Sequence, residues 1–215
     1  MKIAHVAAAT LMSALLAASL VAAAPPDDAL AKYREYVAAI RDGELENVVK
    51  LVEPVPESST PLLTASVESK IAMEAVKKEM TAQMGPPKPD DQAWNIGQLS
   101  DELLNRLEAV AEDPDTVGLM VKDPQVFAGW MVRQKGQWVV PAAMVMDLPP
   151  APKFTEPGKE EREQRLKYAQ ATTKAAEAVL KRLHNKEFKT PAEVQNALGE
   201  QIDKAAPAQG EIGEE

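Results

Sequence analysis

Residues 127–140 read Phe-Ala-Gly-Trp-Met-Val-Arg-Gln-Lys-Gly-Gln-Trp-Val-Val, and this stretch is the strongest indication of β-structure in the chain. β-Branched and aromatic residues fill both arms, and Gln134-Lys135-Gly136-Gln137 between the arms is typical of a tight hairpin turn. A further strand is predicted at 116–121. We therefore expect an antiparallel meander, in which residues 144–146 extend the returning strand past Pro141.

Apolar residues at helical spacing predict three helices before these strands. The first follows Asp27-Asp28, which favour the positive end of a helix dipole, and it ends at Asp42-Gly43, where glycine suits a left-handed C-cap. A short second helix is predicted over 45–52. A long third helix begins at Thr60-Pro61, with proline at the first helical position, and ends before Gly85.

The stretch 100–113 fits two interpretations. Leu103, Leu104 and Leu107 have the spacing of a helix, whereas Ala109-Val110-Ala111 fits a strand that leads into a turn. We interpret the stretch as a helix that gives way to a short strand, and the choice between helix and strand for 100–112 stays open.

Two further helices are predicted at the C-terminal end. Residues 148–157 are rich in proline and are expected to form an extended linker after an α+β domain at 24–147. Thr190-Pro191-Ala192-Glu193 is a capping box that starts the last helix. We expect a helical hairpin over 158–204, followed by a disordered tail at 205–215.

The helix at 159–185 raises the question of a partner. It is charged, with a narrow apolar stripe at heptad spacing formed by Leu166, Ala169, Thr173, Ala176, Leu180 and Leu183. Such a stripe has to be buried against the rest of the chain, against a second copy or against another protein. This helix is therefore the candidate surface for a protein partner or for self-association.

The N-terminal segment has the layout of a secretory signal peptide. Lys2 is followed by an alanine-rich apolar stretch and by small residues that a signal peptidase accepts. We expect cleavage after Ala23, because proline at position 25 would hinder a cut after Ala24. The mature chain is then exported to the periplasm or beyond the cell. It has no cysteine and so no disulfide, which favours a bacterial source, and no later segment is apolar enough to span a membrane.

The amino-acid composition disfavours several classes of partner and site. The chain of 215 residues has a net charge of −9, which disfavours nucleic acid as a partner. With no cysteine and only His184 left after cleavage, the ligands of a zinc or transition-metal site are missing, and no phosphate-binding loop is present. We expect no metal and no cofactor.

His184 is interpreted as a cation near a helix C-terminus. Trp94, Trp130 and Trp138 have the chemistry to stack on a ligand such as a sugar, but core packing is favoured for the last two.

Two segments carry a family resemblance. Residues 36–48, Tyr-Val-Ala-Ala-Ile-Arg-Asp-Gly-Glu-Leu-Glu-Asn-Val, precede residues 130–140, Trp-Met-Val-Arg-Gln-Lys-Gly-Gln-Trp-Val-Val. Over about 26–146 the chain resembles the nuclear-transport-factor-two-like (cystatin-like α+β cone) domains of exported bacterial proteins. The resemblance implies an α+β fold, with N-terminal helices packed on a curved antiparallel sheet. The C-terminal helical hairpin lies outside the resemblance and follows this domain. The long methionine-rich third helix and the few strands depart from the family pattern.

The resemblance also implies two functions. Most exported members are non-catalytic, so the first expectation is a binding or scaffold protein. The alternative is an isomerase or dehydratase of the cone type, which works with a carboxylate base and a tyrosine. By position, Glu53 would be the base, and Tyr33 or Tyr36 would donate a hydrogen bond to a developing oxyanion.

Overall fold

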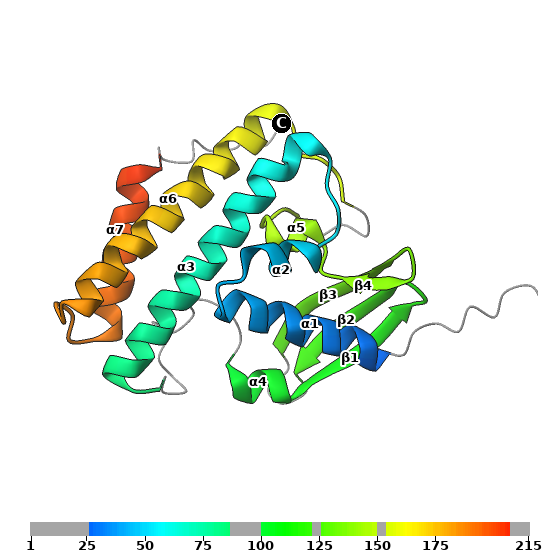
Figure 1. Ribbon diagram of the computed structural model, residues 1–215, viewed down its shortest axis with the longest axis horizontal. Helices are drawn as coiled ribbons and strands as arrows, with labels where there is room; N and C mark the ends of the chain where they lie inside the picture. Colours follow the sequence, from blue (N-terminus) through cyan, green and yellow to red (C-terminus); the bar gives the residue numbers. More distant parts are fainter. Residues whose placement is uncertain (1–25, 87–99, 122–125, 150–153, 207–215) are drawn as a thin grey trace, which may run out of the picture.

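The computed structural model describes residues 26–86, 100–121, 126–149 and 154–206 (Figure 1). The expected signal peptide, Trp94 and residues 207–215 of the expected tail lie outside the described residues. The helices are α1 (Pro26–Arg41), α2 (Leu45–Lys50), the short 3-10 helix η1 (Glu57–Ser59), α3 (Thr60–Met84), α4 (Asp101–Asn105), α5 (Ala142–Val145), α6 (Lys159–His184) and α7 (Pro191–Ala205). The strands are β1 (Leu107–Asp113), β2 (Thr116–Val121), β3 (Val126–Gln134) and β4 (Gln137–Val139).

The four strands form one antiparallel sheet in the order β1-β2-β3-β4. The predicted hairpin is confirmed: Lys135 and Gly136 join β3 to β4 with φ angles of 49° and 82°, the left-handed pair that matches strand twist. The interpretation of 100–113 is confirmed as well. The Ser100 side chain caps α4 by accepting a hydrogen bond from the Leu103 N–H, and β1 follows from Leu107.

The predicted strand extension over 144–146 is wrong, because this stretch ends α5 instead. Val140 leaves β4 and pairs in parallel with Val52, which brings the chain to the end of α2. Pro141 has no N–H to continue a ladder, and the alanines that follow favour a helical turn. The turn directs Val145 and Met146 into the core, where both are almost fully buried.

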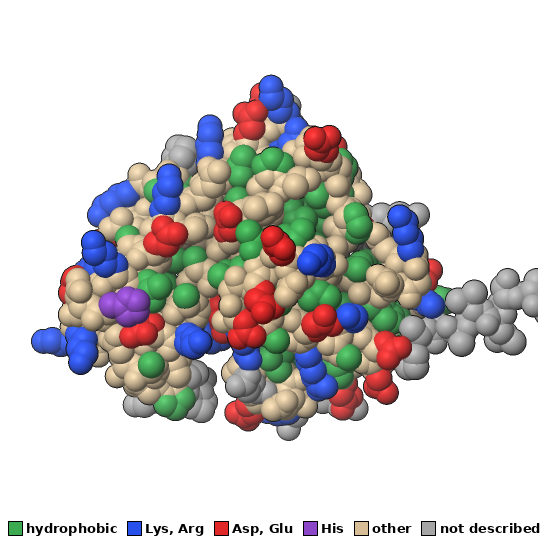
Figure 2. All heavy atoms as spheres, in the orientation of Figure 1, with side chains coloured by type: hydrophobic (Ala, Val, Ile, Leu, Met, Phe, Trp, Pro, Cys, Tyr) green, Lys and Arg blue, Asp and Glu red, His purple; other side chains and the backbone are tan. Residues whose placement is uncertain are grey.

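The main core lies between the sheet and the first three helices. Figure 1 shows α1 in front of the sheet, with α2 next to it and α3 running past both. Alternate strand residues point towards these helices, and Val117, Leu119 and Met131 are at most 1 % exposed. Tyr36 and Val37 on α1 meet them from the helix side. The outer surface over these helices carries mixed acidic and basic side chains (Figure 2).

A second core holds the C-terminal hairpin to the rest of the molecule. α3, α6 and α7 lie side by side (Figure 1), and their facing side chains form a separate apolar cluster. α3 contributes Val76 and Met80 to it, while its N-terminal half contributes Leu62 and Leu63 to the main core. Much of the stripe of α6 is therefore covered within the same chain. Its members Ala176 and Leu183 are fully buried there.

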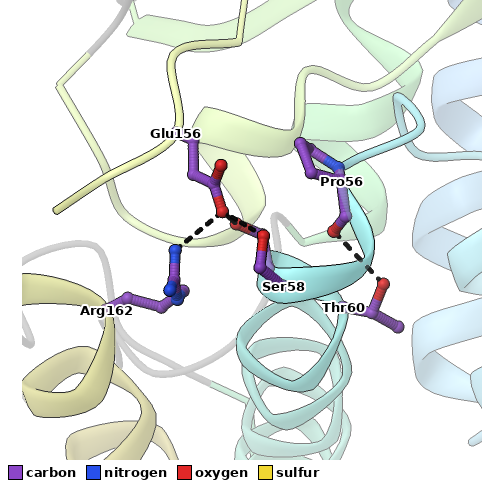
Figure 3. A network of polar contacts seen from close by, with 6 residues as sticks. Pro56, Ser58, Thr60, Glu156 and Arg162 are labelled. Atoms are coloured by element: carbon purple, nitrogen blue, oxygen red, sulfur yellow. Dashed lines mark hydrogen bonds and ion pairs between the residues drawn. The ribbon is translucent and has the colours of Figure 1, made fainter. Parts of the chain in front are cut away.

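The end of the predicted linker is also docked on the folded chain. The Glu156 carboxylate accepts hydrogen bonds from Ser58 and from Ser59, the latter at 3.0 Å, and pairs with Arg162 at 2.7 Å (Figure 3). The two serine hydrogen bonds and the nearby guanidinium hold the pKa of Glu156 below its usual range. This contact ties the start of α6 to the start of α3, while Phe154 packs against the main core.

The fold is α+β, with N-terminal helices on an antiparallel sheet followed by a C-terminal helical hairpin, as the sequence predicts.

The capping box of α7 is present in modified form. Thr190 Oγ1 accepts from the Glu193 N–H at 3.3 Å, but Glu193 reaches back to the N–H of Lys189 rather than that of Thr190. No helix among the described residues is both long and apolar enough to cross a bilayer.

Candidate functional site

A pocket of about 530 Å³ lies on the sheet face that points away from α1. Strand alternation places Thr116, Trp130 and Val132 on this face, opposite the main core. The chain that turns back through α5 forms the other wall. The apolar lining residues are Trp130, Val132, Pro141, Ala143, Met144 and Leu148, and the polar ones are Glu112, Asp113, Thr116 and Asp147.

A β-bulge shapes the wall of this pocket. Leu119 pairs with Gly129 and Met120 pairs with Phe127, so Ala128 is an extra residue in β3. Gly129 has a φ angle of 146°, and a Cβ atom there would lie 2.5 Å from the Met144 sulfur. Glycine thus allows the Met144 side chain to rest directly on the strand. This contact couples α5 to the sheet.

The bulge also brings two aromatic rings together. Phe127 and Trp130 would point to opposite faces of a regular strand, because they are three positions apart. The extra residue puts them on the same face, where the ring centroids are 4.5 Å apart at an interplanar angle of 62°. Such an edge-to-face pair fixes the indole orientation. Phe127 is 47 % exposed, whereas Tyr33, Tyr36 and Trp138 are almost fully buried.

The charged residues that line the pocket are all acidic. Asp113 accepts a hydrogen bond from the Asp115 N–H at 2.8 Å, and Asp147 pairs with Lys70 at 3.2 Å. The Glu112 carboxylate makes no hydrogen bond or ion pair with another described residue. Its Oε1 lies 3.0 Å from the position that a Cβ of residue 118 would take, so the carboxylate lies over Gly118. None of the lining residues is basic.

A second pocket, of about 700 Å³, lies between α1, α2 and β4. Charged residues of both signs surround it, including Lys32, Glu35 and Lys50. Lys32 and Glu35 already pair with each other at 2.6 Å. This second pocket is therefore less suited to an apolar ligand than the pocket beside α5, because charges of both signs and an ion pair surround it.

The structure places Glu53 in a buried connection between elements. Its side chain accepts hydrogen bonds from Gln134 Nε2 at 2.5 Å and from the Ala142 N–H at 3.3 Å, and the residue is 6 % exposed. Both carboxylate oxygens are therefore occupied, one by β3 and one by the start of α5. The group acts as an acceptor that links these elements to the end of α2.

Tyr33 and Tyr36 lie together in the main core. Their ring centroids are 6.0 Å apart, and the Tyr33 hydroxyl donates to the Ala128 carbonyl at 3.5 Å. Ala128 and Gln134 are six positions apart on β3, which at the usual rise per residue is about 20 Å. The structure therefore holds Tyr33 and Glu53 at opposite ends of that strand. Neither of the two pockets is lined by Glu53, Tyr33 or Tyr36.

The two tyrosines predict how stability changes at high pH. Burial raises the pKa of Tyr33 to about 12. Burial, with smaller contributions from Tyr33 and Asp147, raises the pKa of Tyr36 further. Unfolded tyrosines ionise near pH 10, so the stabilisation is complete below about pH 10 and is lost as the pH rises towards 12.

A Tyr168→Phe variant isolates this effect, because only Tyr33 and Tyr36 then remain. We expect its tyrosinate absorbance to rise only together with the loss of helical circular dichroism. Ionisation of both tyrosines near pH 10, while the circular dichroism stays native, would contradict their burial.

The remaining sequence candidates have separate positions. Trp138 is 5 % exposed in the main core, as predicted, whereas Trp130 is only partly buried and lines the pocket beside α5. His184 ends α6 and lies 3.6 Å from Glu79 Oε2, which is the place of a cation at a helix C-terminus. Among the described residues, no three His, Asp or Glu side chains gather closely enough to hold a metal ion.

The sequence did not indicate Glu112, Thr116 or Met144 as site residues. The available signal was Ala128-Gly129 before Trp130, because glycine inside a strand pattern often marks a bulge. Comparison with protein-family models, curated proteins and solved structures found no match to this chain.

Proposed function

We propose that this chain is an exported, non-enzymatic binding protein, and that it holds a small, largely apolar organic molecule between the sheet and α5. The observation that carries this proposal is the pocket of about 530 Å³ with the partly exposed Trp130 in its wall. Its volume lies within the roughly 300–1,000 Å³ that is usual for small-molecule sites. The signal-like N-terminal segment supports the export part of the proposal.

The walls of the pocket are held by packing that is independent of a ligand. Val145 and Met146 anchor α5 in the main core, and Met144 rests on Gly129. Arg165 on α6 donates to the Asp147 carbonyl at 2.7 Å, and Lys70 on α3 pairs with the Asp147 carboxylate. A site with preformed walls pays less ordering entropy on binding. We assign the scaffold part of the expected function to α3, α5 and α6, which hold these walls in place.

The enzymatic alternative requires a carboxylate base and a tyrosine that face one substrate. Glu53 has both oxygens engaged, and its hydrogen-bond partner on β3 lies about 20 Å along the strand from that of Tyr33. This arrangement gives the alternative no support. Kinship with the cone-domain family stays a proposal, which the order of helices followed by an antiparallel meander supports.

A neutral apolar fluorophore tests the proposal. We expect N-phenyl-1-naphthylamine to bind the mature chain with one site, and Trp130→Ala to weaken binding by about ten-fold or more, because the indole supplies the largest apolar surface of the lining. Tyr168→Ala is the matched control, since Tyr168 is an exposed aromatic residue outside the pocket. Equal weakening by both substitutions, or no saturable binding, would refute the proposed site.

A further inference from the structure

We propose that the ligand of this pocket carries an organic ammonium group, and that the group binds between the Glu112 carboxylate and the indole ring of Trp130. The inference rests on the proposed function, because it names the chemical class that the pocket beside α5 accepts. It begins from the positions of three residues on neighbouring strands, Glu112, Gly118 and Trp130.

Gly118 brings the carboxylate and the indole close together. In the sheet, Gly118 on β2 pairs with Trp130 on β3, and Val110 pairs with Gly118 from the other side. The Glu112 carboxylate lies over Gly118, in the space that a larger side chain would fill. Neighbouring strands are about 4.8 Å apart, so the carboxylate is about one strand spacing from the base of the indole side chain.

The balance of charge selects a cation. The pocket is lined by three carboxylates and by no basic residue. Asp147 pairs with Lys70, and Asp113 accepts a hydrogen bond within its own turn, so Glu112 is the carboxylate of the lining that has no partner among the described residues. An anionic ligand would be repelled by the charges of Glu112 and Asp113. The net charge of −9 adds a field that attracts cations.

The apolar walls of the pocket favour an organic cation over a metal ion. A metal ion needs several oxygen ligands around it, and the lining beyond the acidic edge consists of apolar groups such as Met144 and Leu148. An alkylated ammonium group instead spreads its charge over methyl groups, which pack against apolar side chains. Aromatic rings attract such ions through the electrons of the ring face, most strongly for tryptophan. Trp130 beside Glu112 therefore offers both interactions to one ligand.

A pair of probes with the same shape separates charge from apolar contact. Phenyltrimethylammonium and tert-butylbenzene differ by a single charged nitrogen. We expect the cation to bind the mature chain at least about ten-fold more tightly at low salt, and to lose most of this advantage at high salt. We expect Glu112→Gln to weaken the cation about ten-fold and to leave the affinity of tert-butylbenzene unchanged.

Glu163→Gln is the matched control, because it removes the same charge from an exposed residue of α6 that does not line the pocket. Glu112 is itself exposed, so its substitution leaves the fold intact, which a thermal melt verifies. If both probes bind equally, or if the two glutamate variants behave alike, the ammonium inference is wrong and the apolar site stands. If neither probe binds, the inference and the proposed function both fail.

Discussion

Replacing Val179 by aspartate is expected to lower the free energy of unfolding by about 3–5 kcal/mol, the largest effect of any single substitution considered for this chain. Val179 is fully buried between α6, α7 and α3, in the second core. An aspartate there would lose its hydration without a positively charged partner in the cluster. Typical domains have only about 5–15 kcal/mol of stability, so much of the population would unfold under mild denaturant.

Ala178→Asp is the matched control, since this neighbour on α6 points to solvent. Urea unfolding of both variants, followed by circular dichroism, measures the difference. Equal stability of the two variants would mean that α6 is not docked on α3. The apolar stripe would then be available to a second copy or another protein.

The packing of α6 and α7 on α3 also explains why the C-terminal hairpin is not a separable appendage. A chain that ends at Asp147 would leave Val76 and Met80 of α3 exposed along with the rest of their face. We expect such a chain to be less stable than the mature chain and to self-associate through this face.

Replacing Glu53 by alanine is expected to cost about 2–3 kcal/mol of stability, because it leaves one buried and one partly buried donor without an acceptor. The Ala142 N–H loses its side-chain acceptor, and the side-chain amide of Gln134 on β3 loses the Glu53 carboxylate. The connection between the end of α2 and the start of α5 would loosen. Urea unfolding with tryptophan fluorescence as the probe would measure the loss.

A double-mutant cycle isolates the hydrogen bond between Glu53 and Gln134. We expect Gln134→Ala alone to destabilise the chain, and Glu53→Ala with Gln134→Ala to cost about 1 kcal/mol less than the sum of the single losses. Strictly additive losses would show that the two side chains do not interact. In that case the Glu53 carboxylate would be available to act as the base that the family resemblance implies.

Local sequence features predicted most of the secondary structure, because the signals are short-range. The helical spacing of apolar residues gave α1, α3 and α6, and Lys135-Gly136 gave the hairpin turn. α5 was mispredicted because Met144-Val145-Met146 favours a strand locally, while burial of its apolar side chains against the main core favours a helical turn. Tertiary contacts overrode the local preference there.

The site was harder to predict, because it depends on contacts between distant segments. Nothing next to Glu53 in the sequence shows that Gln134 and the Ala142 N–H will occupy its carboxylate. The stripe on α6 was recognised, but sequence alone did not select α3 as its cover. Trp130 was assigned to the core, because the register shift at Ala128 that determines its neighbours depends on pairing with β2.

The most direct measurement is an NMR titration of the mature chain with phenyltrimethylammonium, observing the indole N–H of Trp130 and the methyl group of Met144. Both groups line the pocket beside α5, and Tyr33 and Glu53 lie outside it. We expect saturable shifts at Trp130, Met144 and Thr116, which Glu112→Gln weakens. Shifts centred on Tyr33, Tyr36 or Glu53, or no saturable shift at all, would contradict the assignment of this pocket as the binding site.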